Sequence, residues 1–180
     1  YSTYIEGLKN NVLEDGKIHT IYNQALTQTG RLSSREPNLQ NITIRDEESK
    51  EVRKAFIASE DGWYILSFDY SQIELRVLAH MANEQEMIKA FNSGVDIHTL
   101  TAKNLYGVKD NEVDSTMRRH AKVVNFGIIY GMSDWGLADD LGIGVKQASS
   151  FKEKYFNSYP EIQKYFKKTI DEANESLIVK

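Results

Sequence analysis

The sequence predicts an α+β fold in which a small antiparallel sheet precedes a mostly helical region. Short apolar segments bounded by turn residues occur in the first 70 residues. From Gln72 onward, apolar residues recur at helical spacing almost to the end of the chain. Because the strands and helices are separated along the chain instead of alternating, an α+β class is favoured over a parallel α/β sheet.

Three strands are expected in the first region. Residues 18–23 and 31–34 are short strand candidates on either side of a turn, and an irregular loop containing Pro37 follows them. Residues 63–69, W-Y-I-L-S-F-D, are predicted to form the best strand, because aromatic and β-branched residues follow the turn pair Asp61-Gly62.

The second region is predicted to consist of successive helices. Each candidate has apolar residues at a period near 3.6. The candidates are residues 72–81, 84–92, 97–105, 115–130, 135–141, 146–157 and 161–176.

The composition is that of a globular domain and excludes several kinds of site. The chain has 180 residues, 41% hydrophobic and 27% charged, with a net charge of -4. This charge argues against a protein that coats nucleic acid with general positive charge, although a local basic groove stays compatible with it. The absence of cysteine excludes thiolate zinc sites, so a metal site would use carboxylate oxygens and favour magnesium or manganese. No signal peptide or membrane-length apolar run occurs, so we expect a cytoplasmic protein without membrane contact.

Residues 115–131, S-T-M-R-R-H-A-K-V-V-N-F-G-I-I-Y-G, are the most informative stretch. On a helix with about 100° of rotation per residue, one face carries Arg118, Lys122, Phe126 and Tyr130. These residues lie at roughly 0°, 40°, 80° and 120° around the helix axis. The opposite arc collects the apolar residues Val124, Met117, Ile128 and Ala121. Cations suit phosphates and rings suit bases, so this face is predicted to hold a nucleotide. The alternative is a solvated helix face whose two rings belong to the core.

The stretch from Ser67 to His80, S-F-D-Y-S-Q-I-E-L-R-V-L-A-H, is the second informative one. Asp69 stands where the predicted strand ends and a helix begins. Its carboxylate there could bind a hard cation, with the carbonyl of Tyr70 as a second oxygen. The alternative is that Asp69 or Ser71 caps the helix. Glu74 lies in the first helical turn, where the helix dipole favours an acid whatever its function.

Together these stretches resemble family A DNA polymerases, the bacterial DNA polymerase I group. D-Y-S-Q-I-E-L-R corresponds to the palm motif of that family, and R-R-x-x-K-x-x-x-F-G-x-x-Y-G to its fingers helix. Three further segments agree in order and spacing: T-G-R-L-S-S from Thr29, P-N-L-Q-N-I from Pro37 and D-I-H-T from Asp96. The resemblance implies a DNA-directed DNA polymerase with primer–template DNA and dNTP as partners. Residues 1–82 would form part of the palm, and residues 83–180 the helical fingers.

The resemblance implies a role for each matching residue. Asp69 would be one of two aspartates that hold a pair of Mg²⁺ ions, with the Tyr70 carbonyl assisting. Arg118 and Lys122 would clamp the triphosphate, and His98 would support its β-phosphate.

Further residues would contact the sugar, the base and the DNA. Gln72 would belong to the nucleotide-binding set, and Glu74 would exclude ribonucleotides at the sugar 2′-position. Phe126 would pack against the incoming nucleotide, where a phenylalanine is associated with discrimination against dideoxynucleotides. Tyr130 would stack at the template position, and Gly131 would permit close backbone approach there. The primer–template contacts would be Arg31, Asn38, Gln40, Asn41 and Arg45. Arg31 or Gln40 could read minor-groove acceptors shared by all correct pairs.

Other residues of the chain have simpler interpretations. His98 near a helix start could be a cap or a satisfied surface residue. The pair Asp139-Asp140 is interpreted as a solvated helix face. Gly142-Ile143-Gly144 is interpreted as a loop or helix stop, because it lacks the strand and glycines of a dinucleotide fold.

The chain also departs from the family pattern. The His-Asp-Glu motif that supplies the second metal-binding aspartate does not occur in it. The chain starts at Tyr1 without a methionine, so we expect it to be a piece of a longer protein. Because the second metal-binding aspartate is missing, we expect the 180 residues alone to be inactive. An exposed sheet edge would favour self-association or a swapped dimer. The alternative function is a non-catalytic nucleic-acid-binding module, although such a module has no use for a nucleotide clamp.

Overall fold

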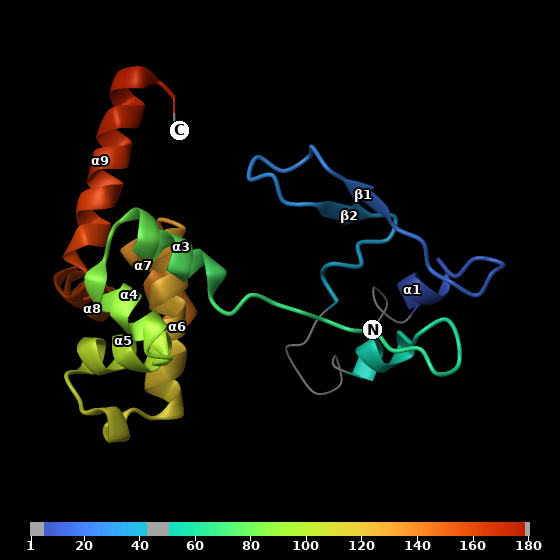
Figure 1. Ribbon diagram of the computed structural model, residues 1–180, viewed down its shortest axis with the longest axis horizontal. Helices are drawn as coiled ribbons and strands as arrows, with labels where there is room; N and C mark the ends of the chain where they lie inside the picture. Colours follow the sequence, from blue (N-terminus) through green and yellow to red (C-terminus); the bar gives the residue numbers. More distant parts are fainter. Residues whose placement is uncertain (1–5, 43–50, 179–180) are drawn as a thin grey trace. The chain divides into compact units, whose positions relative to one another are not determined.

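The protein is described by a computed structural model that covers residues 6–42 and 51–178. It contains two compact units, residues 1–68 and residues 69–180 (Figure 1). The first holds a two-stranded antiparallel sheet and the second is helical, which confirms the predicted α+β class. The assignment of residues 1–82 to a palm and 83–180 to fingers stays a prediction.

The N-terminal unit has little regular structure. Its described elements are α1 (Gly7–Lys9), β1 (Ile21–Asn23), β2 (Ser33–Arg35) and the 3₁₀ helix η2 (Val52–Ala55). Strand β1 pairs with β2 in antiparallel register, with Tyr22 opposite Ser34. The two short strands therefore form close to where they were expected. Ser34 is the only buried residue that the structure describes in this unit.

The strand predicted for residues 63–69 does not form, so that prediction is wrong. Residues 63–69 have no regular secondary structure, and their large apolar side chains are 61% to 92% exposed. A strand needs a hydrogen-bonded neighbour, and in the described parts of the chain β1 and β2 are the only paired strands, apart from one isolated bridge between Val12 and Ile18. High β-propensity is therefore not sufficient at this position, because propensity reflects packing on a sheet.

The C-terminal unit is a helical bundle whose helices match the expected ones within one or two residues. Its elements are α3 (Ile73–Met81), α4 (Gln85–Asn92), α5 (Ile97–Tyr106), the 3₁₀ helix η3 (Asp110–Glu112), α6 (Ser115–Ile129), α7 (Asp134–Leu141), α8 (Val145–Ser158) and α9 (Pro160–Ser176). Local caps define several ends. At the start of α6, the side chain of Asp114 accepts a hydrogen bond from the backbone N–H of Met117. At the start of α7, the side chain of Ser133 accepts one from the backbone N–H of Gly136. Gly142 closes α7 in the left-handed conformation.

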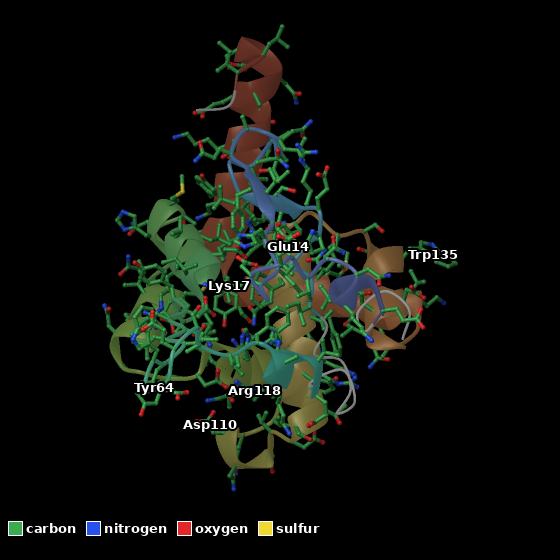
Figure 2. The ribbon with its side chains drawn as sticks, turned by 90° about the vertical axis from the view of Figure 1, so that its right-hand side faces the viewer. Glu14, Lys17, Tyr64, Asp110, Arg118 and Trp135 are labelled. Atoms are coloured by element: carbon green, nitrogen blue, oxygen red, sulfur yellow. The ribbon has the colours of Figure 1, made fainter. Side chains whose placement is uncertain are left out.

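Helix α6 contacts four other helices of the bundle, α3, α5, α7 and α8. Its side chains Ala121, Val124 and Ile128 join the hydrophobic core, which also includes Leu75 of α3 and Leu105 of α5. By contrast, Trp135 points outward from α7 and is 76% exposed (Figure 2). No helix within the described residues is long and apolar enough to span a membrane.

Candidate functional site

The face of α6 opposite the core carries the predicted cations and rings. Arg118 and Lys122 are exposed, Phe126 is half-buried, and Tyr130 is exposed at the end of the helix. The predicted amphipathic arrangement of this helix is therefore confirmed. Within the described residues Lys122 has no ion-pair partner, and the residue is exposed.

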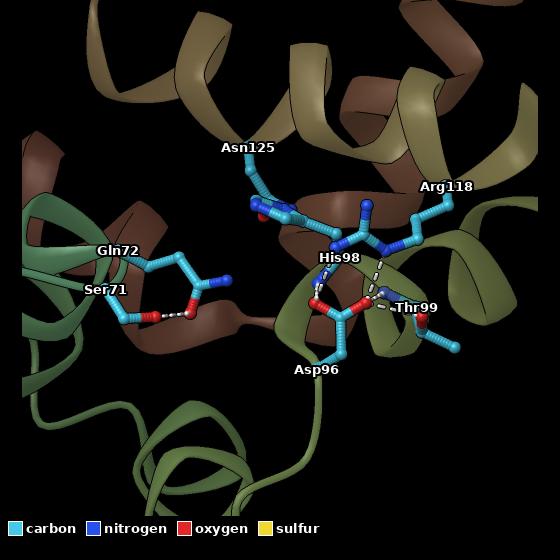
Figure 3. Close-up of polar contacts among 7 residues, drawn as sticks. All are labelled: Ser71, Gln72, Asp96, His98, Thr99, Arg118 and Asn125. Atoms are coloured by element: carbon cyan, nitrogen blue, oxygen red, sulfur yellow. Dashed lines mark hydrogen bonds and ion pairs between the residues drawn. The ribbon is translucent and has the colours of Figure 1, made fainter. Parts of the chain in front are cut away.

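Arg118 is held by an aspartate at the start of the neighbouring helix α5. Its Nε donates to Oδ2 of Asp96 at 2.6 Å, and its Nη2 donates to Oδ1 at 3.3 Å (Figure 3). Asp96 also caps α5, because its oxygens accept the backbone N–H groups of His98 and Thr99. Burial alone would raise the pKa of Asp96, but the hydrogen bonds from Arg118 and Thr99 outweigh it and hold the pKa at about 2. The carboxylate therefore stays ionised and fixes the guanidinium in a forked geometry.

His98 lies in the first turn of α5 and is only 3% exposed. It is neither a helix cap nor a surface residue, because Asp96 provides the cap. Its Nδ1 lies 3.1 Å from Nδ2 of Asn125, and its ring centroid lies 6.1 Å from that of Phe126. Burial lowers the pKa of His98, and although Asp96 opposes the shift, Arg118 and Lys122 add to it. The ring is therefore neutral at neutral pH.

A second pair of predicted residues meets at the C-terminal end of α6. The hydroxyl of Tyr130 donates to Oε2 of Glu74 at 2.8 Å, which connects α6 to the first turn of α3. Gln72 precedes α3 in the left-handed conformation, with φ of 50°, and its Oε1 accepts a hydrogen bond from Ser71. Gly131 also has positive φ, at 65°. A residue without Cβ is thus favoured directly after Tyr130.

Asp69 and Tyr70 precede α3 and are exposed. In the described ranges, no three His, Asp or Glu residues come close enough together to hold a metal ion. One exposed carboxylate and one backbone carbonyl do not complete a site for two Mg²⁺ ions. The residues that the structure describes therefore do not fit the predicted metal pair by themselves.

Most of the predicted DNA contacts lie in the N-terminal unit, before and after β2, whereas Tyr130 and Gly131 lie in the helical unit. Oε1 of Gln40 accepts a hydrogen bond from the backbone N–H of Ser34. Oδ1 of Asn38 accepts one from the backbone N–H of Gln40. Arg31 and Asn41 are exposed. Arg45 lies outside the described residues. The polar side chains of Asn38 and Gln40 thus shape their own loop.

Three contributors to the site are absent from the sequence-based prediction of its residues: Asp96, Thr101 and Asn125. The resemblance includes Asp96 as the first residue of D-I-H-T but implies no role for it. Asn125 and Thr101 hydrogen-bond to each other in the core beside His98. An amide at the edge of the apolar arc of α6, at roughly 340° on the same projection, is the signal that could have identified Asn125.

Comparison with known proteins gives a consistent result. The family model described as DNA polymerase family A matches residues 1–180. DNA polymerase I of Bacillus caldotenax is 55% identical over 175 residues, 97% of this chain and 20% of that protein. The thermostable DNA polymerase I of Thermus aquaticus is 48% identical over 173 residues, 96% of this chain and 21% of that protein.

A solved structure is also similar. It is described as the POL domain of Pol1 from M. smegmatis in complex with DNA primer-template and dNTP. It superposes with a TM-score of 0.85 at 40% identity, over 95% of this chain and 30% of that one. The chain spans about a fifth of the length of the curated relatives, at 20% to 21%.

Proposed function

The chain belongs to DNA polymerase family A. We therefore propose that it is the nucleotide-binding part of a DNA-directed DNA polymerase. In the proposed reaction the primer 3′-hydroxyl attacks the α-phosphate of a dNTP opposite a template base, and pyrophosphate leaves. The observation that carries this proposal is the exposed face of α6, where Arg118 lies fixed by Asp96 and Lys122 follows one turn later.

Arg118 and Lys122 are proposed to bind the triphosphate. Asp96 uses one N–H of Nε and one of Nη2, so the remaining N–H groups of the guanidinium can donate to phosphate oxygens. Lys122 adds a point charge. Catalysis of phosphoryl transfer is mostly positioning and charge stabilisation, so cations fixed before the substrate arrives contribute directly to rate.

For the other predicted residues we propose the roles that the resemblance to the family implies. His98 would donate to the β-phosphate, Phe126 would pack against the nucleotide, and Gln72 would be a further nucleotide contact. Glu74 would exclude a ribose 2′-hydroxyl, and its hydrogen bond from Tyr130 supports this role because it fixes the carboxylate. The proposed DNA contacts are Arg31, Asn38, Gln40, Asn41, Arg45, Tyr130 and Gly131.

Asp69 is proposed as a metal ligand of the longer polymerase, with the carbonyl of Tyr70. A Mg²⁺ pair would supply activation of the primer hydroxyl and charge neutralisation. Because one carboxylate is not sufficient, we expect no primer extension by the 180 residues alone. In a longer polymerase that contains these residues, Asp69→Ala should abolish extension while leaving primer–template binding nearly intact.

Titration of dATP into the 180-residue chain tests the phosphate clamp. Lys122→Ala and Arg118→Ala should each weaken dATP binding about tenfold or more, because each removes a charge-assisted contact. Arg119→Ala is the matched control, since Arg119 is an exposed cation on the same helix but points about 100° away from Arg118. Equal effects of all three variants would contradict the proposal. Salt-dependent primer–template binding with no nucleotide binding would favour the alternative, a non-catalytic nucleic-acid-binding module.

We also propose that the chain self-associates through its exposed apolar segment at residues 63–68. Light scattering over a concentration series should show a mass above that of one chain. A monomer at every concentration would contradict this. A cytoplasmic location stays a prediction.

A further inference from the structure

A chain of buried polar groups ends at His98. Asn125, Thr101 and Tyr159 are each fully buried, although all three side chains carry polar atoms. The hydroxyl of Tyr159 lies 3.2 Å from Oγ1 of Thr101, which in turn lies 3.2 Å from Oδ1 of Asn125. Nδ2 of Asn125 lies 3.1 Å from Nδ1 of His98. Figure 3 shows the side chains of Asn125 and His98 reaching toward each other from α6 and α5.

The direction of each hydrogen bond follows from the chemistry of the groups. Thr101 donates to the amide oxygen of Asn125, so its own oxygen can accept from Tyr159. With its oxygen engaged, Asn125 presents its NH₂ group to the imidazole, and an NH₂ group only donates. Nδ1 of His98 must therefore accept, which leaves the ring proton of the neutral imidazole on Nε2.

Nε2 is the atom of His98 that remains available to a ligand. It has no hydrogen-bond partner within the described residues. Among those residues, the only fully buried side-chain polar atom without a partner is the hydroxyl of Tyr155. Nε2 of His98 therefore keeps some contact with solvent even though the residue is 3% exposed.

We propose that Asn125, held by Thr101 and Tyr159, is a positioning residue that fixes His98 in its Nε2–H tautomer, ready to donate to a phosphate oxygen. A phosphate oxygen only accepts hydrogen bonds, so the opposite tautomer would present a lone pair to it and repel it. The phosphate part of this inference rests on the proposed function. The tautomer part concerns the chain alone.

Long-range ¹H–¹⁵N NMR of the uniformly labelled 180-residue chain tests the tautomer directly. In the wild-type chain, Nε2 of His98 should be protonated and Nδ1 unprotonated. Asn125→Asp places an acceptor-only carboxylate at Nδ1, so the proton should move to Nδ1. Thr101→Val frees the amide and should give a mixture of tautomers, whereas Thr101→Ser keeps the hydroxyl and should retain the wild-type spectrum. Thr169→Val is the matched control, because in the part of the chain that the structure describes the Thr169 hydroxyl donates only to the carbonyl of Tyr165 within α9.

Titration with dATP then connects the tautomer to binding, with Lys122→Ala as the reference. Asn125→Asp and Thr101→Val should weaken dATP binding roughly tenfold, and Thr169→Val should not. Protonation of Nδ1 in the wild-type chain, or an unchanged tautomer in Asn125→Asp, would overturn the inference. If Lys122→Ala weakens dATP binding but Asn125→Asp does not, the positioning role fails while the proposed function stands. If Lys122→Ala has no effect, the proposed function fails, and the NMR spectra alone decide the tautomer assignment.

Discussion

The two compact units of the chain differ in how they use their apolar residues. In the described residues every buried hydrophobic side chain lies between Leu75 and Ile162, within the helical unit. The N-terminal unit exposes many of its large apolar side chains, including Tyr22, Leu26 and the segment at residues 63–68, and the described others are at most half-buried. The difference shows what each kind of element needs. A helix pairs its backbone groups internally and must only bury one face, whereas a strand needs a partner for both its backbone and its side chains.

The largest expected effect comes from removing one buried leucine of the helical unit. Leu75 is fully buried in α3, so Leu75→Ala should lower the free energy of unfolding by about 3 kcal/mol. Leu66→Ala removes the same atoms from a side chain that is 76% exposed. It should therefore change the free energy of unfolding by less than about 0.5 kcal/mol. Urea unfolding followed by helical circular dichroism measures both. A similar loss for both variants would show that residues 63–68 are packed in solution, and would break the comparison.

A smaller effect is expected from a buried cap that joins two helices of the same unit. Glu84 is 3% exposed. Its Oε1 accepts a hydrogen bond from the backbone N–H of Glu86 in α4, and its Oε2 accepts one from the backbone N–H of Glu161 in α9. Glu84→Ala leaves both donors without this acceptor, which should cost about 2 kcal/mol in the same urea experiment. Glu86→Ala is the control, because the one hydrogen bond or ion pair of the Glu86 side chain within the described residues is an exposed pair with Lys89. A loss below that of the control would mean that α9 is not held through Glu84.

The same difference explains how much could be predicted from the sequence. Helix ends are set by residues next to them, so Asp114, Ser133 and Gly142 mark boundaries that a reader can find without a structure. The strand at residues 63–69 could not be judged in this way. Its formation depends on a neighbouring strand, and the segment itself carries no information about that neighbour.

The candidate site divides along similar lines. The face of α6 with Arg118 and Lys122 follows from periodicity within one helix, so the sequence predicted it. The partner of Arg118 is Asp96, which lies on another helix and 22 residues away in the chain. Likewise, the hydrogen bond between Tyr130 and Glu74 joins residues 56 apart. Such pairs depend on how helices pack, and the spacing of residues within one helix does not reveal them.

The smallest expected effect concerns the ion pair at the edge of the helical unit. Asp96→Asn keeps a cap acceptor for α5 but removes the charge that pairs with Arg118. In the folded chain the pKa of Asp96 is about 2, below its ordinary value of 3.8, so the pair stabilises the fold above about pH 4 and loses this contribution as the pH falls toward 2. Because the pair is partly exposed and screened by solvent, the variant should lose about 1 kcal/mol at neutral pH.

The pH dependence separates this ion pair from the packing of the core. The difference in unfolding free energy between wild type and Asp96→Asn should shrink as urea unfolding is repeated from neutral pH down to pH 3, whereas the loss in Leu75→Ala should stay constant. Asp110→Asn is the matched control, because the carboxylate of Asp110 pairs with Lys103 at 3.1 Å but is 74% exposed. A pH-independent difference for Asp96→Asn would mean that the lost stability does not come from the charge of Asp96, because asparagine keeps the cap of α5. The ion pair would then not hold Arg118 in place, and the guanidinium would have to be positioned by the phosphate itself.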